Sequence, residues 1–299
     1  MSKYSKSLSI GIHAKSVTRF KWSGYSSISI ESADRSIIID PVESNKNSTY
    51  QYVFCTNNNY AHLWPGVIEK LAESKGFRRI FLSRACLYPS EDSNSKTLTY
   101  LNEPYWKIEQ YVIFYPKYFD HSVSRGLEGD TAILAGSGRD LPNGLPMPVG
   151  QFDNSNPETP RPFAGLDEII VDGWHIEGLE MIGNKVDVPF QVKGAMPQLG
   201  FIVHDLVSGV TYCHMGGNQR AYEDLKNFSR GIDVLLINIV QKDPLEIKKI
   251  IQLIEPKCVV PIGFKDSPDD PFVGELVKFC DSLPAKLVVP NRDEIYRVD

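Results

Sequence analysis

Three consecutive asparagines follow an apolar, strand-like segment, and a histidine comes shortly after them. These residues are Asn57, Asn58, Asn59 and His62, in the stretch CTNNNYAHLW. An asparagine amide both donates and accepts hydrogen bonds, and an imidazole can transfer protons near neutral pH. Such a loop at the end of a sheet can hold an oxygen-rich ligand or an oxyanion. The alternative is a plain turn with a structural histidine, because asparagine tolerates left-handed backbone conformations.

The remaining histidines and the cysteines show no comparable grouping. The five cysteines are widely spaced and lie mostly in apolar segments, which indicates buried, reduced thiols rather than disulfides or a Cys-x-x-Cys metal site. His175 and His204 lie in strand-like segments flanked by apolar residues. They are therefore weak candidates for a functional role.

The segments around these residues predict two β-rich halves, each with its own helices. The first 56 residues are expected to form an antiparallel meander, followed by a helix at about 65–75 and a strand. In the second half, further strands lead into helices near 221–229, 244–256 and 272–283, which alternate with apolar strands. This order favours helices packed outside two facing sheets.

A segment rich in Gly, Pro and Asn lies between the two halves, at about residues 137–163. It predicts a long irregular loop, since these residues do not sustain a regular hydrogen-bond ladder. A loop of this length is either a lid or pocket wall, or an insertion that the fold tolerates.

The composition narrows the class of protein. The hydrophobic content of 42% in 299 residues is sufficient for a large core. A formal net charge of −5 gives no broad basic field, so nucleic acid is not an expected partner. The sequence shows neither the apolar centre of a secretory signal nor a long uninterrupted apolar stretch. We therefore expect a cytoplasmic protein without a membrane partner.

Several segments follow one another in an order that has a precedent. They are SGYSSISIESADRSIIIDPV, YVFCTNNNYAHLWPGVIEKL, GFIVHDLVSGVTYCHMGG, DVLLINI, PKCVVPIGF and KLVVPNRDEIYRV. Together they resemble the metallo-β-lactamase superfamily, especially its lactonase-like branch related to ascorbate-phosphate lactonase. The resemblance implies one domain over residues 1–299 with an insertion at about 137–163. It also implies an α/β (α+β) fold, a four-layer αββα sandwich of two mixed β-sheets with outer helices.

The same resemblance identifies the positions that normally hold two metal ions. In this sequence they are occupied by Asn57, Asn59, Ala61, His62, Asn184, Gly217 and Gly263. Only one imidazole remains, an amide oxygen is a poor zinc ligand, and glycine and alanine offer no side-chain donor. The usual dinuclear centre is therefore not expected to form, and we expect no metal cofactor.

Two further residues are assigned roles through the resemblance. Asp40 would support the histidine loop in the family, and here it is expected to fix the asparagine loop by accepting backbone hydrogen bonds. Cys213 shares the strand alternation of Gly217 and is expected to face the same cavity. No basic partner is evident beside it, so a catalytic thiolate is not expected.

Three functional hypotheses follow. The first is a metal-free protein that binds or transforms a small organic molecule in the former active-site cleft, with His62 as the candidate catalytic residue. The second is a metal-dependent hydrolase of lactones or phosphoesters with a rearranged metal site, and the third a non-catalytic pseudoenzyme that acts through a protein partner. Under the first hypothesis, the expected ligand contacts are Asn57, Asn59, Asn184, Cys213, Gly217 and Gly263.

Overall fold

The computed structural model describes residues 17–43, 49–57, 61–83, 86, 111–114, 168–181, 198–217, 221, 223–228, 231–240, 242–266 and 271–298. The expected loop at 137–163 lies outside these residues, as do Asn59 and Asn184. Among the helices described, none is long and apolar enough to cross a membrane.

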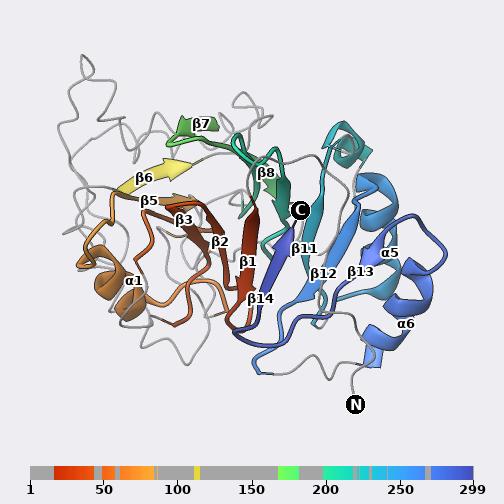
Figure 1. Ribbon diagram of the computed structural model, residues 1–299. Coiled ribbons are helices and arrows are strands. Elements are labelled where there is room, and N and C mark those ends of the chain that lie inside the picture. Colours follow the sequence, from red (N-terminus) through yellow and green to blue (C-terminus); the bar gives the residue numbers. More distant parts are fainter. Residues whose placement is uncertain are drawn as a thin grey trace, which may run out of the picture.

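Two β-sheets of seven strands each face one another (Figure 1). The first has the order β14-β1-β2-β3-β4-β5-β6 and the second the order β13-β12-β11-β10-β9-β8-β7. The strands of the first sheet are β1 (Thr18–Trp22), β2 (Ile28–Ser32), β3 (Arg35–Ile39), β4 (Tyr52–Cys55), β5 (Arg79–Ser83), β6 (Tyr111–Phe114) and β14 (Ile295–Val298). Those of the second are β7 (Glu168–Val171), β8 (Trp174–Met181), β9 (Gln198–Asp205), β10 (Thr211–His214), β11 (Val234–Asn238), β12 (Cys258–Ile262) and β13 (Lys286–Leu287).

Helices cover the outer faces of both sheets. Helix α1 (Pro65–Ala72) packs on the first sheet, and helices α5 (Pro244–Ile254) and α6 (Pro271–Cys280) pack on the second. A short 3₁₀ helix, η3 (Glu223–Phe228), contacts α5. Helix α5 illustrates the local cause: Asp243 caps its first turn, and four isoleucines, all buried, recur at helical spacing. The four-layer αββα sandwich expected from the sequence is thus confirmed.

Aromatic side chains fill the space between the two sheets. Phe54 of the first sheet meets Phe201 of the second with ring centroids 5.0 Å apart. Phe20 meets Tyr212 in the same way at 6.4 Å, and the buried Tyr212 hydroxyl donates to Thr18 Oγ1 at 3.1 Å. These contacts lock the sheets face to face, since buried aromatic pairs combine large apolar area with a preferred geometry.

The expectation of a wholly antiparallel meander at the start of the chain is wrong at its last strand. β1, β2 and β3 pair antiparallel, but β3 and β4 pair parallel, with Ile37 opposite Tyr52. The connection between them spans residues 40–51, which is long enough for the crossover that a parallel pair requires. As a result, β4 ends at the same edge of its sheet as β3.

One edge of the sandwich gathers strand ends from both sheets. β10, β11 and β12 run parallel, so their carboxyl ends lie together. The end of β4 joins them, because Leu199 N donates to the Thr56 carbonyl at 3.2 Å. A Cβ atom on Gly216 would lie only 3.1 Å from Thr56 Cβ. We call this edge, with Asn57, His62, Gly217, Lys242 and Gly263, the strand-end region.

Candidate functional site

A buried hydrogen-bond network holds His62 in the strand-end region. Asp40 Oδ1 accepts from Thr56 N at 2.8 Å, and Asp40 Oδ2 accepts from Thr56 Oγ1 at 2.8 Å. His62 Nδ1 lies 2.6 Å from the same Oδ2 atom. A contact this short to a carboxylate places the proton on Nδ1 and fixes the orientation of the ring. Asp40 thus ties the chain after β4 to the histidine.

The side chain of Asn57 points into this network rather than into open solvent. Asn57 is 3% exposed, and its Nδ2 lies 3.5 Å from Thr56 Oγ1. Ala61 precedes His62 and is partly buried. In the part of this loop that the structure describes, His62 is the side chain suited to proton transfer.

Beside Gly217 lies a cation that the sequence analysis did not single out. Lys242 Nζ is 3.5 Å from the Gly217 carbonyl oxygen, and the lysine is half-buried. Burial lowers the pKa of Lys242 to about 8, because an ammonium group loses hydration there. The available signal was a lysine two residues after the apolar segment DVLLINIV, which reads as a buried strand.

Asn238 occupies the space next to Gly263. Gly263 has φ +106°, and a Cβ atom at this position would lie 2.3 Å from Asn238 Oδ1. The Asn238 amide is held in place because its Oδ1 accepts from Val240 N at 3.1 Å. A side chain at position 263 would therefore need both a strained backbone and the displacement of Asn238.

Cys213 and His214 belong to the core. Cys213 is fully buried, its thiol lies 3.7 Å from Met215 Sδ, and burial raises its pKa to about 12. His214 is also fully buried; Nε2 donates to the Ser26 carbonyl at 2.8 Å and Nδ1 accepts from Gly216 N at 3.1 Å. Burial lowers the pKa of His214, so its imidazole is neutral. The Cys213 thiol is therefore a core group and not an expected ligand contact of the strand-end region.

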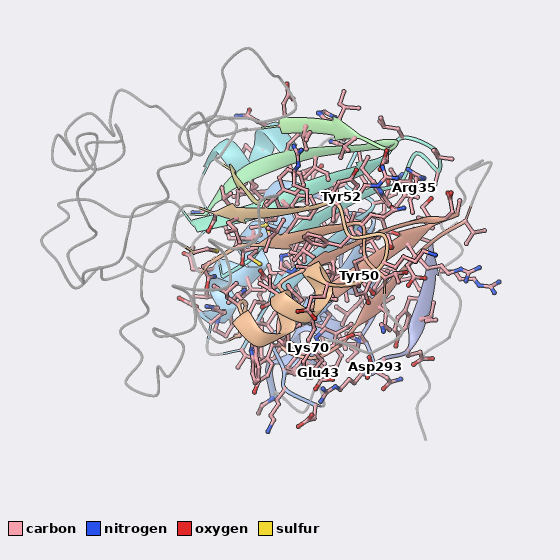
Figure 2. All side chains as sticks on the ribbon, turned by 90° about the vertical axis from the view of Figure 1, so that its left-hand side faces the viewer. Arg35, Glu43, Tyr50, Tyr52, Lys70 and Asp293 are labelled. Atoms are coloured by element: carbon pink, nitrogen blue, oxygen red, sulfur yellow. The ribbon has the colours of Figure 1, made fainter. Side chains whose placement is uncertain are left out.

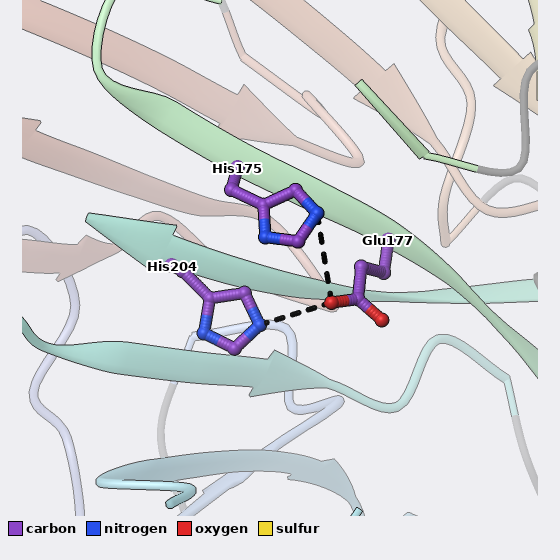
Figure 3. A group of neighbouring side chains, drawn as sticks. All are labelled: His175, Glu177 and His204. Atoms are coloured by element: carbon purple, nitrogen blue, oxygen red, sulfur yellow. Dashed lines mark ion pairs between the residues drawn. The ribbon is translucent and has the colours of Figure 1, made fainter. Parts of the chain in front are cut away.

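A second group of polar side chains lies on the outer face of the second sheet (Figure 3). His175 and Glu177 come from β8 and His204 from β9, and their nearest ligand-type atoms all lie within 4.8 Å of one another. From the sequence, His175 and His204 were weak candidates, and nothing joined them to Glu177. The only local signal of this group was the spacing His-x-Glu in a strand, which puts both side chains on one face.

A shallow polar groove of about 350 Å³ lies at the amino-terminal end of β4. Arg35 and Tyr50, labelled in Figure 2, are among its lining residues, with Lys21, Glu31 and Lys75. Charges of both signs and the wide opening make it an ordinary solvated depression. It is separate from the strand-end region, since Tyr50 precedes β4 and Asn57 follows it.

A model of a β-lactamase superfamily domain matches residues 19–263. The chain belongs to the metallo-β-lactamase superfamily. No curated protein is matched by the sequence. The lactonase-like branch expected from the sequence stays a prediction.

Solved structures of the same superfamily fold resemble the chain over most of its length. A proposed metal-dependent hydrolase from Parabacteroides distasonis aligns with a TM-score of 0.54 at 13% identity, covering 91% of each chain. Igni18, a metallo hydrolase from Ignicoccus hospitalis, gives 0.50 at 15% identity over 95% of this chain and 99% of that one. YhfI from Bacillus subtilis gives 0.51 at 10% identity, with coverages of 93% and 98%. At these identities the likeness shows the fold alone.

Proposed function

We propose that this metallo-β-lactamase superfamily member binds a small organic anion at the strand-end region without a metal ion. The observation that carries the proposal is the Lys242 ammonium group beside the Gly217 carbonyl. Gly217 stands where the resemblance puts the carboxylate that bridges two metals. A half-buried ammonium group attracts carboxylates and phosphates strongly, since solvent screens it less than a surface charge.

The donors in the described part of the region support the absence of a metal pair. Among the expected metal-ligand positions that the structure describes, three have no side-chain donor: Ala61, Gly217 and Gly263. Asn238 stands where a side chain on Gly263 would have to go. The Lys242 charge would also repel a divalent cation. These residues do not fit the superfamily's dinuclear centre.

His62 is the candidate for chemistry on a bound ligand. Its Nδ1 is held by Asp40 at 2.6 Å, which leaves Nε2 as the nitrogen with a free lone pair. A carboxylate that orients an imidazole in this way fixes which nitrogen can accept a proton from a ligand. Proton transfer by His62 next to an anion held by Lys242 needs no Lewis acid.

Thermal unfolding in the presence of small anions tests the proposal. The probes are inorganic phosphate and a panel of small organic phosphates and carboxylates, applied to the wild type, Lys242→Met and the control Lys248→Met. Lys248 is a lysine of α5 that pairs with Glu275 at 3.5 Å. A ligand at about 100 times its Kd stabilises the folded state by about 2.7 kcal/mol. We expect this gain in the wild type and Lys248→Met, and its loss in Lys242→Met.

Two results would count against the proposal. Equal stabilisation of Lys242→Met and the wild type would remove Lys242 from the site. No stabilisation of the wild type by any probe would favour a pseudoenzyme that acts through a protein partner.

The metal-dependent hydrolase remains the second candidate, because the proteins from P. distasonis and I. hospitalis are described as metal hydrolases. Elemental analysis of a His175→Ala/His204→Ala variant separates the two candidates. This variant lacks two of the possible metal ligands on the outer face of the second sheet, so any metal found would be bound elsewhere. We expect well under one equivalent of zinc, iron or manganese in that variant. Two equivalents would instead establish a dinuclear centre.

A further inference from the structure

We infer that His175, Glu177 and His204 form a binding site for one zinc-like divalent ion on the outer face of the second sheet. The three side chains come from neighbouring strands, with His175 opposite His204 in the register of β8 and β9. Alternation along β8 turns Trp174 and Ile176 into the core, so His175 and Glu177 point outward. Figure 3 shows both imidazoles directed at the Glu177 carboxylate.

The two distances from Glu177 to the histidines are close to those between ligands of one zinc ion. Glu177 Oε1 lies 3.3 Å from His204 Nε2 and 3.6 Å from His175 Nε2. Two ligands at about 2.0–2.1 Å from a tetrahedral zinc ion are about 3.3 Å apart. The three donor atoms lie within 4.8 Å of one another, so small side-chain movements suffice to bring them around one ion.

One of the two imidazoles is oriented as metal-ligating histidines usually are. His204 Nδ1 lies 3.0 Å from Thr211 Oγ1, on the adjacent strand β10. A hydrogen bond from Nδ1–H to this hydroxyl selects the tautomer whose Nε2 lone pair is free for a metal. The two rings stack at 5.2 Å with an interplanar angle of 20°, which holds both in place.

The hairpin that carries His175 and Glu177 is anchored to the first sheet. Its turn, Asp172–Gly173, has positive φ at both residues, as a tight two-residue hairpin requires. The Asp172 carbonyl accepts from Arg35 Nη1 at 3.0 Å, and its carboxylate accepts from the Tyr52 hydroxyl at 2.6 Å. Arg35 and Tyr52 lie near one another in Figure 2. This anchoring limits the motion of β8, so the cluster is preorganised.

The donor set selects the class of metal. Two imidazoles and one carboxylate favour zinc and its neighbours in the first transition row over Mg²⁺ and Ca²⁺, which prefer oxygen ligands. The side chains of His175, Glu177 and His204 are 22%, 13% and 32% exposed, so an ion can enter from solvent. Three protein donors leave one tetrahedral position for water or another ligand.

This cluster is distinct from the superfamily's metal position. His204 faces Thr211 at the start of β10, whereas Gly217 follows the end of that strand. β10 is extended over Thr211–His214, about 10 Å at about 3.3 Å per residue, and the turn at Gly216 and Gly217 lies beyond its far end. The cluster also lies on the outer face of the sheet. The inference therefore stands whether or not the strand-end region binds an anion.

Titration of the metal-free full-length protein with zinc chloride, followed by calorimetry, tests the inference. We expect one equivalent to bind to the wild type. His175→Ala and His204→Ala should each weaken binding by at least 10- to 100-fold, the range already seen when only a group behind a ligand is lost. Thr211→Val should weaken it about 10-fold, because it removes only the acceptor that orients His204.

Two control variants make the result specific. His62→Ala removes the imidazole described in the strand-end region and should leave zinc affinity within about threefold, as should Lys248→Met, whose side chain pairs with Glu275 between α5 and α6. Circular dichroism checks that each variant is folded. Zinc binding lost in His62→Ala but kept in His204→Ala would overturn the inference, and so would no zinc binding to the wild type. In the latter case the cluster is only a set of histidine–glutamate ion pairs.

Discussion

The Asp40 carboxylate lies 2.6 Å from His62 Nδ1, and the aspartate is fully buried while the histidine is 4% exposed. The same carboxylate also accepts from the backbone and hydroxyl of Thr56. Asp40 therefore satisfies several buried donors at once. Its removal leaves Thr56 N without this acceptor, and leaves Thr56 Oγ1 and His62 Nδ1 with only each other as acceptor, 3.0 Å apart, in this network. Asp40 thus joins the end of β4 to His62 through one buried carboxylate.

Replacing Asp40 by alanine should lower the free energy of unfolding by about 3 kcal/mol, because buried donors lose a charged acceptor. Asp40→Asn is the matched control. It keeps one acceptor oxygen and tolerates the positive φ of 51° at this position, so we expect a loss of only about 1 kcal/mol. Urea denaturation measures both. Losses below about 1 kcal/mol in both variants would show that the network contributes little.

The stability of the protein should depend on pH through Lys242. Its pKa is about 8 in the folded state against an ordinary value of 10.5. Between these values the unfolded chain binds more protons at this residue, so the free energy of unfolding rises with pH in this window. Below pH 8 the charged lysine is protonated in both states, and the cost of its burial is fully present.

Lys242→Met should therefore be more stable than the wild type at pH 7, by about 1–2 kcal/mol after allowance for partial exposure. The difference should shrink towards pH 10. Urea denaturation at pH 7 and pH 9.5, with Lys248→Met alongside, checks this. A difference that does not change with pH would mean that Lys242 is not the group responsible.

Anion binding to the wild type should weaken as pH rises through about 8, since the neutral amine of Lys242 no longer attracts an anion. Titration of the best stabilising probe at pH 7 and pH 9 measures the effect. We expect about a 10-fold loss of affinity, because the protonated fraction falls about 10-fold above the pKa. An affinity that is unchanged at pH 9 would contradict a role for the ammonium group.

Gly263→Ala should be strongly destabilising, by about 2–4 kcal/mol. The alanine would have to keep a φ of +106°, and its Cβ atom would lie 2.3 Å from Asn238 Oδ1. Gly274→Ala in α6 is the control: nothing lies within 4 Å of its Cβ position, and alanine should stabilise the helix by about 0.5–1 kcal/mol. Thermal denaturation compares the two. An unchanged stability of Gly263→Ala would show that the Asn238 side chain moves aside at little cost.

Histidines restored at Asn57 and Asn59 should not recreate the superfamily's metal centre. Gly217 and Gly263 would still lack donors, and Lys242 would remain beside Gly217. In a background without His175 and His204, we expect at most weak binding of one metal ion and no useful hydrolysis of lactones or phosphodiesters. Robust hydrolysis by this variant would refute the metal-free proposal.

Much of the fold was predictable because its causes are local or periodic. Apolar alternation located β1 to β4, and the helical spacing of isoleucines located α5. The order of these elements, with the loops at Asn57, Gly217 and Gly263, was enough to indicate the superfamily. The residue types at those positions also predicted a shortage of metal donors, since that depends on identity and not on geometry.

Only the tertiary structure decided which side chains come together in the strand-end region and in the His175, Glu177 and His204 cluster. Lys242 reaches Gly217 across 25 residues of sequence and Asn238 fills the space at Gly263, and neither contact has a local pattern. Glu177 and His204 are brought together only by the register of β8 with β9. A shift of one residue in that register would turn His204 into the core and abolish the cluster. Strand pairing between distant segments, which no single segment specifies, therefore determines where this protein can bind a metal.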